Sequence, residues 1–216
     1  MNSRMSDAEI SGSCLTYEFT TDMRYMLQYA ELVKQYYKKD LNLDLAASNM
    51  DQDLCCLNRN ERLFIVRDGI TVVGGAKLSF SSTLSDVLLP MESSEFRVQS
   101  VLPKKYGKYT YAELGRLVVN PDFRGKEVLA RIIQELTAYT VQQGGGYLFV
   151  LAPPLNSVLY RRVCKGLSMK VAIHKDVDWG EKDAYKHLQL QLLSCDIREL
   201  YPQSVPAEAE FMPIAI

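Results

Sequence analysis

The sequence predicts a single α/β domain, and three observations carry this prediction. An Asp68-Gly69 pair joins two apolar runs, which is a strong local signal for a β-hairpin. In the second half, segments with strand patterns alternate with segments whose apolar residues follow helical spacing. Neither an internal repeat nor a low-complexity tract divides the 216 residues. A chain of this length can bury one sizeable core.

The first half predicts a helix followed by the hairpin. Residues 1–16 are small and polar, so we expect a flexible N-terminus there. Two threonines and an aspartate then offer N-caps for a helix over about 23–39. The hairpin strands follow at 63–66 and 70–80. Residues 81–108 form a long connection, which is either functional or contains short elements of its own.

The second half predicts a regular alternation of strands and helices, bounded by glycines and prolines. One of its strands is a near-continuous apolar run, as expected at the centre of a sheet. The strands are expected at 109–119, 147–152, 170–174 and 185–193, and the helices at 126–143 and 156–165. Prolines interrupt residues 194–216, so we expect an irregular C-terminal tail after a domain over 17–193.

Composition excludes several classes of protein. The 25 basic and 26 acidic residues leave a net charge of −1, which gives no argument for a nucleic-acid partner. No apolar run reaches the ~20 residues of a membrane span, and the start has no signal-peptide core. Five cysteines without a C-x-x-C motif are typical of a reduced, cytoplasmic protein. The two histidines lie too far apart to suggest a metal site, and we expect no metal.

One strand-to-helix turn predicts an anion site. The strand that ends at Val119 is followed by a proline, a glycine and then a helix. The start of a helix presents unpaired N–H groups and the positive end of its dipole. Arg124 and Lys126 add two positive charges there, so phosphate or pyrophosphate is a natural guest. The alternative is an ordinary turn with solvated charges.

The residues of this turn resemble the GNAT acyltransferase superfamily. In that family an R-x-x-G-x-G/A element holds the pantetheine and pyrophosphate of the donor. Arg124 and the following Gly125 match, whereas Glu127 and Leu129 replace the later small residues. Because Glu127 adds bulk and negative charge, a weaker or different phosphate contact is implied.

A second motif matches at the distance that the family leads one to expect. Asn156 and Tyr160 stand in a helix that ends at Gly166, which resembles the helix of GNAT enzymes in which an asparagine precedes a tyrosine and a glycine. By this resemblance Asn156 contacts the pantetheine arm, and Tyr160 lies near the donor sulfur and protonates the leaving thiolate. The alternative is a tyrosine packed on the core with its hydroxyl in solvent.

Taken together, the two motifs extend the resemblance over roughly residues 60–193. The fold that it implies is a single GNAT-like domain, with a mixed, mostly antiparallel central sheet that splays and is flanked by helices. The donor inserts into the splay, where it bonds the backbone of the strand that carries Leu117, Val118 and Val119.

The same strand carries a pattern that narrows the resemblance. Glu113 and Arg116 resemble the E-x-x-R of the acyl-homoserine-lactone (autoinducer) synthases and of their long-chain N-acyl amino acid synthase relatives. An ideal strand would point these two side chains to opposite faces unless a bulge, for which Gly115 is suited, intervenes. The early acidic pair of that branch corresponds to Asp51 and Asp53.

Two departures favour the amino acid synthase relatives within this branch. The signalling synthases have a Trp-containing N-terminal segment and an arginine after the hairpin strand. This chain has Trp179 as its only tryptophan and Lys77 where an arginine is expected.

The implied activity is N-acyl transfer from an acyl thioester to a primary amine such as an amino acid. Glu113 is the candidate general base, or else a buried structural glutamate paired with Arg116, which is the candidate substrate-binding residue. The donor is acyl-CoA or an acyl carrier protein, with a medium or long chain. Basic residues that could meet the acidic surface of a carrier are Arg124, Lys126, Arg131, Arg161, Arg162 and Lys165.

Two other functions stay open at this point. One is an acetyl-CoA-dependent N-acetyltransferase, and the other is a non-catalytic module that binds acyl thioesters or a protein. The acceptor site is expected in the parts that the resemblance covers least, residues 17–59 and 81–108.

Overall fold

The computed structural model describes residues 14–45, 50–102, 110–175, 177 and 183–200, and its framework is a seven-stranded sheet. The strands lie in the order β1-β2-β3-β4-β5-β7-β6, and only β4 and β5 are parallel neighbours. The mixed, mostly antiparallel sheet of the prediction is thereby confirmed. The strands are β1 (Leu15–Thr20), β2 (Glu61–Asp68), β3 (Thr71–Ser82), β4 (Thr110–Val119), β5 (Gly145–Ala152), β6 (Lys170–His174) and β7 (Gln191–Asp196).

Four α-helices and three short 3₁₀ turns connect the described strands. The side chain of Asp22 caps the first helix by accepting a hydrogen bond from the backbone of Arg24. Pro154 occupies the first turn of the last helix, where its missing N–H costs nothing. The helices are α1 (Met23–Leu41), α2 (Met50–Cys55), α3 (Lys126–Gln142) and α4 (Pro154–Gly166), with turns η1 (Val98–Val101), η2 (Pro121–Phe123) and η3 (Asp183–Leu188).

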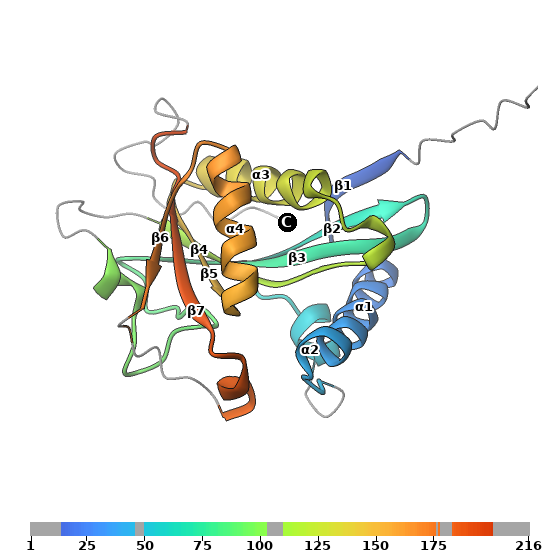
Figure 1. Cartoon of the computed structure of the whole chain (residues 1–216), viewed down its shortest axis with the longest axis horizontal. Helices are drawn as coiled ribbons and strands as arrows, with labels where there is room; N and C mark the ends of the chain where they lie inside the picture. Colours follow the sequence, from blue (N-terminus) through green and yellow to red (C-terminus); the bar gives the residue numbers. More distant parts are fainter. Residues whose placement is uncertain (1–13, 46–49, 103–109, 176, 178–182, 201–216) are drawn as a thin grey trace, which may run out of the picture.

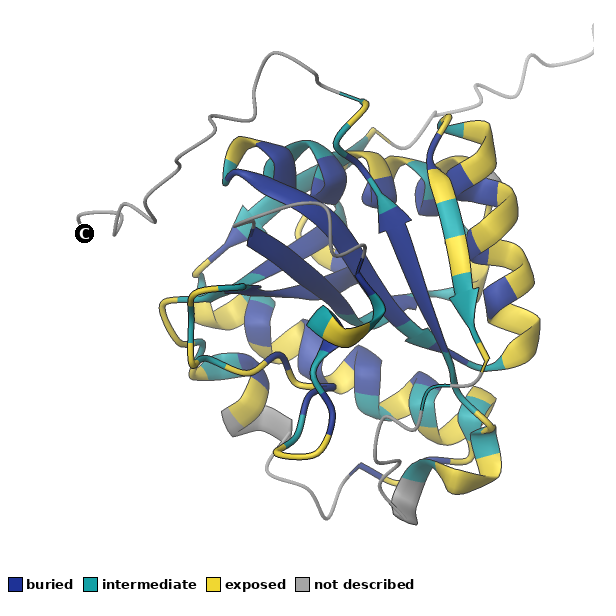
Figure 2. Ribbon diagram, turned by 90° about the vertical axis from the view of Figure 1, so that its left-hand side faces the viewer, coloured by how far each residue is buried: buried dark blue, intermediate teal, exposed yellow. Residues whose placement is uncertain are grey.

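The sheet is covered on both faces, and each cover has its own apolar cluster. Helices α3 and α4 pack on one face, around Ile132, Leu148 and Leu193. On the other face α1 and α2 cover the β2–β3 half. The loop after β3 covers the β4–β5–β7 half with Phe96 and Val98. Figure 1 shows α3 and α1 on opposite sides of β2 and β3, and in Figure 2 the middle strands are dark blue because they are buried.

The two parallel strands separate halfway along their length. Pairing of β4 with β5 runs from Thr110 to Glu113, where Glu113 lies opposite Phe149. Beyond Glu113 the described ladder continues on the β3 side only. The second half of β4 therefore has one edge without a neighbouring strand, which is the splay that the resemblance implied.

Several predicted boundaries were wrong. Strand β1 begins at Leu15, inside the segment expected to be flexible, because its alternating side chains pack on β2. The last strand is Gln191–Asp196 rather than 185–193, and 3₁₀ turn η3 occupies much of that range. Strand β5 begins at Gly145 rather than at residue 147, and a Cβ at Gly145 would lie 2.7 Å from the carbonyl oxygen of Thr140, so this position requires a glycine. Residues 1–13 and 201–216 lie outside the described part.

Candidate active site

A cavity of about 470 Å³ opens where β4 and β5 diverge. Its walls come from α1, α2, β3, the loop after β3, β4, the end of β5, the start of α4 and η3. Five residues that the sequence singled out line it together: Glu113, Arg116, Leu117, Asn156 and Tyr160. The topology therefore joins the strand motif and the helix motif, which lie some forty residues apart, in one cavity.

Glu113 is a buried carboxyl group in the wall of this cavity. Its side chain accepts a hydrogen bond of 2.8 Å from the backbone N–H of Met91, in the loop after β3. Burial raises the pKa of Glu113 to about 7, and the Met91 hydrogen bond and the charges of Arg116 and Lys77 only partly oppose this. A carboxyl group with such a pKa exchanges protons near neutral pH.

Arg116 faces the same cavity because β4 departs from ideal strand geometry there. The register with β3 shifts between Gly75 and Lys77, and Arg116 has a left-handed backbone with φ 54°. The hydroxyl of Tyr29, on α1, donates a hydrogen bond to the Arg116 carbonyl. The irregularity expected near Gly115 thus lies at the next residue, and it lets Glu113 and Arg116 line one cavity.

The guanidinium of Arg116 is held by one side chain of η3 and one of α2. It donates to the hydroxyl of Tyr185 over 3.1 Å, and it lies 3.6 Å from a carboxylate oxygen of Asp53. The pairing of Arg116 with Glu113, one of the two structural alternatives, is absent from the ion pairs of the described residues. Asp51, the other half of the expected acidic pair, has a side chain outside the described part.

A buried cation in the cavity wall, Lys77, was noted in the sequence only as a replacement for an arginine and was given no role in the site. The ammonium of Lys77 lies 2.8 Å from carboxylate oxygens of both Asp53 and Glu61, and only 5% of its side chain is exposed. Asp53 therefore joins Lys77 to Arg116. The hairpin pattern gave no signal for this, because a lysine on a strand is ordinarily a solvated residue.

Tyr160 and Asn156 reach the cavity from the first turns of α4. Ser157 anchors this end of the helix, because its hydroxyl donates to the carbonyls of Ala152 and Pro153. The Tyr160 side chain is buried rather than solvated, and burial raises the pKa of its hydroxyl well above the usual range. Tyr160 therefore holds its proton at neutral pH.

The residues of the predicted phosphate turn lie apart from the lining of the cavity. Arg124 donates to the carbonyl of Val119 over 2.8 Å and forms an ion pair with Asp40 of α1. Gly125 is the N-cap of α3, with open space where a Cβ would be, and the Lys126 side chain is outside the described part. Val118 packs under α1 and α2 rather than lining the cavity.

Within the described residues, no group of three or more His, Cys, Asp or Glu side chains could hold a metal ion. No helix in the part of the chain that the structure describes is long and apolar enough to cross a membrane. Of the six basic residues suggested for a carrier protein, Arg131 is paired with Glu135, whereas Arg161, Arg162 and Lys165 are exposed on α4.

Comparisons with known proteins place the fold. The sequence matches no family model and no curated protein. The structure resembles FeeM, an N-acyl amino acid synthase from uncultured soil microbes, with a TM-score of 0.61 and 13% identity over 90% of this chain and 97% of that one. It also resembles a GNAT-family acetyltransferase of Staphylococcus aureus Mu50, with a TM-score of 0.55 and 9% identity over 85% of this chain and 99% of that one.

A third solved structure is yncA, a putative acetyltransferase from Salmonella typhimurium with its cofactor acetyl-CoA. Its TM-score is 0.52 and its identity 16%, over 86% of this chain and 95% of that one. Sequence identities this low support a shared fold and nothing finer. The chain has the GNAT fold.

Proposed function

We propose that this protein is an N-acyltransferase that moves a medium or long acyl group from an acyl thioester to the primary amine of an amino acid. The observation that carries the proposal is the cavity at the β4–β5 divergence, which brings Glu113, Arg116 and Tyr160 together. Each of the three has a state that suits the reaction: a carboxyl group that titrates near neutral pH, a cation, and a protonated phenol.

The donor arm would lie along the free edge of β4. Residues 114–117 of β4 have no partner on β5, so the backbone groups along that edge, other than the Arg116 carbonyl that Tyr29 occupies, are available to the amides of a pantetheine arm. Asn156 faces the same space. The phosphate of the donor would then meet the start of α3 at Arg124, Gly125 and Lys126, where the helix dipole favours an anion.

The chemistry requires two proton transfers. The amine nitrogen attacks the thioester carbonyl, so that a C–N bond forms and the C–S bond breaks. Glu113 accepts the proton that the amine loses, and Tyr160 gives its proton to the leaving thiolate. A base with a pKa near 7 is poised to accept a proton at neutral pH, and a phenol of raised pKa is still protonated when the sulfur departs.

The acceptor would carry a carboxylate as well as an amine. Arg116 supplies a fixed cation in the cavity wall, and Tyr185 and Asp53 orient it. A guanidinium binds a carboxylate through two parallel hydrogen bonds, which would place the amine of an amino acid at a defined distance. The likeness to an N-acyl amino acid synthase agrees with this assignment.

The second candidate is an acetyl-CoA-dependent N-acetyltransferase. The acidic and basic side chains of Asp53, Lys77 and Glu113 in the cavity wall favour it, since a long acyl chain needs an apolar channel. The likeness to yncA with its acetyl-CoA points the same way.

The donor experiment separates these functions. The purified protein is incubated separately with acetyl-CoA, palmitoyl-CoA and an acylated carrier protein, each with a mixture of amino acids, and thiol release is followed. Turnover with a long-chain donor and none with acetyl-CoA is the expected result. Turnover with acetyl-CoA alone would establish the second candidate instead.

A variant pair tests the assigned chemistry. Glu113→Gln is compared with Glu135→Gln, which removes a half-buried surface carboxylate of α3 that is paired with Arg131. Only the first should lose turnover. Donor binding without turnover, unchanged in Glu113→Gln, would mean that the protein is a non-catalytic binding module.

A further inference from the structure

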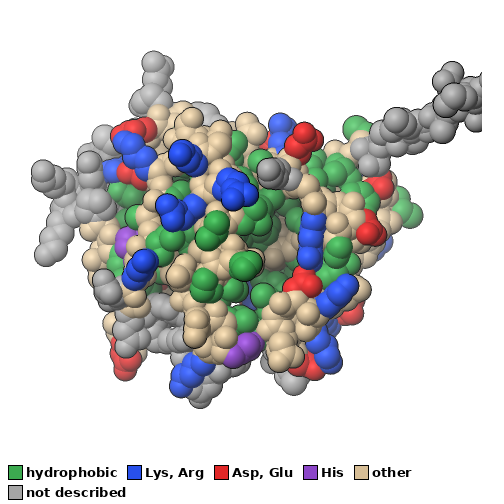
Figure 3. Space-filling view, in the orientation of Figure 1, with side chains coloured by type: hydrophobic (Ala, Val, Ile, Leu, Met, Phe, Trp, Pro, Cys, Tyr) green, Lys and Arg blue, Asp and Glu red, His purple; other side chains and the backbone are tan. Residues whose placement is uncertain are grey.

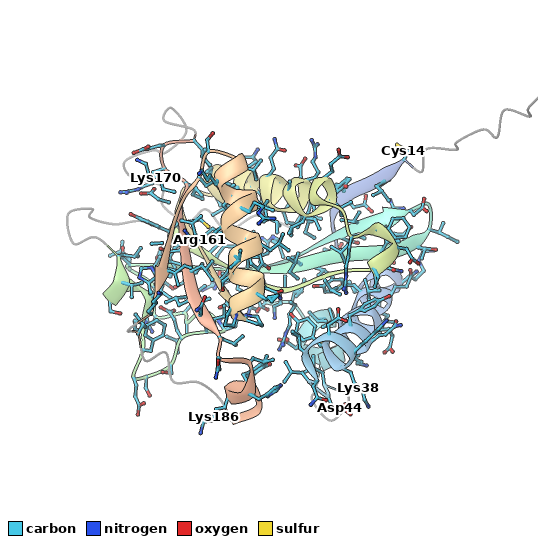
Figure 4. All side chains as sticks on the ribbon, in the orientation of Figure 1. Cys14, Lys38, Asp44, Arg161, Lys170 and Lys186 are labelled. Atoms are coloured by element: carbon cyan, nitrogen blue, oxygen red, sulfur yellow. The ribbon has the colours of Figure 1, made fainter. Side chains whose placement is uncertain are left out.

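The side of α4 that faces away from the cavity is formed entirely by exposed apolar and basic side chains. We call this surface the outer face of α4, and its residues are Leu155, Val158, Leu159, Arg161, Arg162 and Lys165. The three aliphatic side chains are 78%, 56% and 40% exposed. Figure 3 shows blue and green side chains next to one another where α4 lies, and Arg161 is labelled beside the helix in Figure 4.

The charge of this face is not neutralised. Helix α4 contains no acidic residue, and its three cations form no ion pair with any residue that the structure describes. Two basic residues of neighbouring elements differ from these three: Arg131 on α3 is paired with Glu135, and Lys170 on β6 with Glu199. Three unpaired cations along one short helix favour an anionic partner.

A groove of about 580 Å³ runs between the outer face of α4 and β6. Apolar side chains, among them Met169 and Val171, line part of it, and Arg161, Arg162 and Lys165 contribute the charges. Such a groove suits a molecule with an anionic head and an apolar tail, because the head meets the cations and the tail meets the apolar wall.

We propose that the outer face of α4 docks the protein on the surface of an anionic lipid bilayer. A bilayer accepts projecting leucine and valine side chains without a matching shape, and it attracts the neighbouring Arg and Lys side chains through its phosphates. A folded protein partner would have to match the shape of the three projecting aliphatic side chains as well as the charge of the cations. The helix lies in the plane of the surface, and its 13 residues extend for about 20 Å.

Helix α4 contributes both to the proposed docking surface and to the wall of the cavity. The same helix presents Asn156 and Tyr160 to the cavity. Docking through its outer face would place the cavity on the opposite side of α4 from the lipid, about one helix diameter (~10 Å) away. The docking itself goes beyond the proposed function and does not depend on it.

Vesicle sedimentation tests the proposal without any measurement of turnover. The full-length protein is mixed with vesicles of phosphatidylcholine alone or with an equal part of phosphatidylglycerol. Binding to the anionic vesicles is expected, with little binding to the neutral ones, and raising the salt from about 50 mM to about 500 mM should release the protein. Failure to bind anionic vesicles at low salt would overturn the proposal.

Two sets of variants assign the binding to this face. Each of Arg161→Gln, Arg162→Gln and Lys165→Gln is expected to weaken binding about fivefold. The double variant Leu155→Ser/Val158→Ser should weaken vesicle binding more than any one of these single variants does. Met23→Ser/Leu27→Ser, which removes two apolar side chains of α1 that are 50% and 47% exposed, is the control and should leave binding unchanged.

Two further outcomes would count against a lipid partner. Vesicle binding that survives all α4 variants would place the lipid contact elsewhere. An acidic acyl carrier protein, or a second copy of this chain, that binds where vesicles do not, and that loses binding in the same variants, would make the face a protein-docking surface. Circular dichroism of each variant shows that the fold is intact, so that loss of binding reports the surface itself.

Discussion

The backbone N–H of Met91 donates a hydrogen bond of 2.8 Å to the carboxylate of Glu113, which ties the loop after β3 to the middle of β4. Glu92, the next residue of that loop, accepts hydrogen bonds from the backbone N–H groups of Leu89 and Val98, so the loop is itself closed by a carboxylate. The candidate base therefore also anchors a wall of the cavity. A change in its protonation acts on a buried polar contact as well as on chemistry.

Stability should fall as the pH rises through the range in which Glu113 ionises. Below its ordinary pKa of 4.5 the carboxyl is protonated in both states. Between pH 4.5 and about 7 the folded protein keeps a proton that the unfolded chain has lost, so unfolding releases a proton and the free energy of unfolding decreases. In Glu113→Gln this contribution disappears. Urea denaturation measures the free energy of unfolding at pH 5 and at pH 8. Its decrease between these two pH values should be smaller in the variant than in the wild type, by up to ~3 kcal/mol.

The same titration should limit the rate on the acid side. If Glu113 accepts the amine proton, kcat/KM should rise with pH and level off above an apparent pKa near 7. Glu113→Asp should keep part of the activity and of the pH limb, and Glu113→Gln should lose both. An identical pH limb in Glu113→Gln would assign the titration to another group and leave Glu113 a structural role.

Removing the Tyr160 hydroxyl should lower turnover more than binding. In Tyr160→Phe the ring still fills its buried site, but the leaving thiolate has no proton donor, so kcat should fall on the order of 10²-fold with little change in KM for the donor. Stopped-flow measurement of thiol release gives both values. Because the raised pKa keeps Tyr160 protonated, the wild-type rate should show no decline from this group at mildly alkaline pH. A drop in donor affinity at unchanged kcat would show that Tyr160 only contacts the arm.

Lys77 should be needed for stability as well as for the shape of the site. In Lys77→Met the carboxylates of Asp53 and Glu61 lose their common cation, and the expected cost is about 3–5 kcal/mol. The exposed pair of Lys38 and Asp44, both labelled in Figure 4, provides the control. Lys38→Met should cost less than about 1 kcal/mol. Thermal denaturation of the two variants side by side makes the comparison, and equal losses would contradict a buried, paired Lys77.

Local patterns predicted the elements well where one signal dominated. The Asp68-Gly69 turn, the capped α1 and the apolar β5 each follow from residues that are neighbours in sequence. Strand β1 was missed because the composition of residues 1–16 is polar, although Leu15, Tyr17 and Phe19 alternate with polar residues as in a half-buried strand. A composition averaged over a long segment conceals a short alternating strand that starts near its end.

The candidate site likewise contains some residues that sequence patterns predicted and others that they did not. Glu113, Arg116, Asn156 and Tyr160 stand in patterns that pointed to them, and they line one cavity. Their partners could not be read from those patterns. Met91 belongs to a loop without regular spacing, and Lys77 is buried only because two carboxylates approach it from α2 and β2. A pattern identifies a residue type at a position, whereas its charge state depends on groups far away in the sequence.

The left-handed backbone of Arg116 should depend on one such distant group, Tyr29. A positive φ is costly for a residue with a side chain, so surrounding contacts must hold it. The Tyr29 ring packs beside Gly75, where an added Cβ would lie 2.9 Å from it, and its hydroxyl bonds the Arg116 carbonyl. Tyr29→Phe should therefore raise KM for the amine acceptor several-fold through a misplaced guanidinium, and it should cost about 1–3 kcal/mol in unfolding free energy.

Tyr36→Phe is the matched control, because Tyr36 is also buried on α1 but makes no hydroxyl hydrogen bond to a described residue. Its acceptor KM and its stability should stay near those of the wild type. The decisive quantity is the change in KM for the acceptor relative to the change in KM for the donor. Each KM is measured by varying one substrate at a saturating level of the other. A rise in KM confined to the acceptor means that Tyr29 positions Arg116. Equal rises for both substrates would instead indicate general loosening of the cavity and would refute the positioning role.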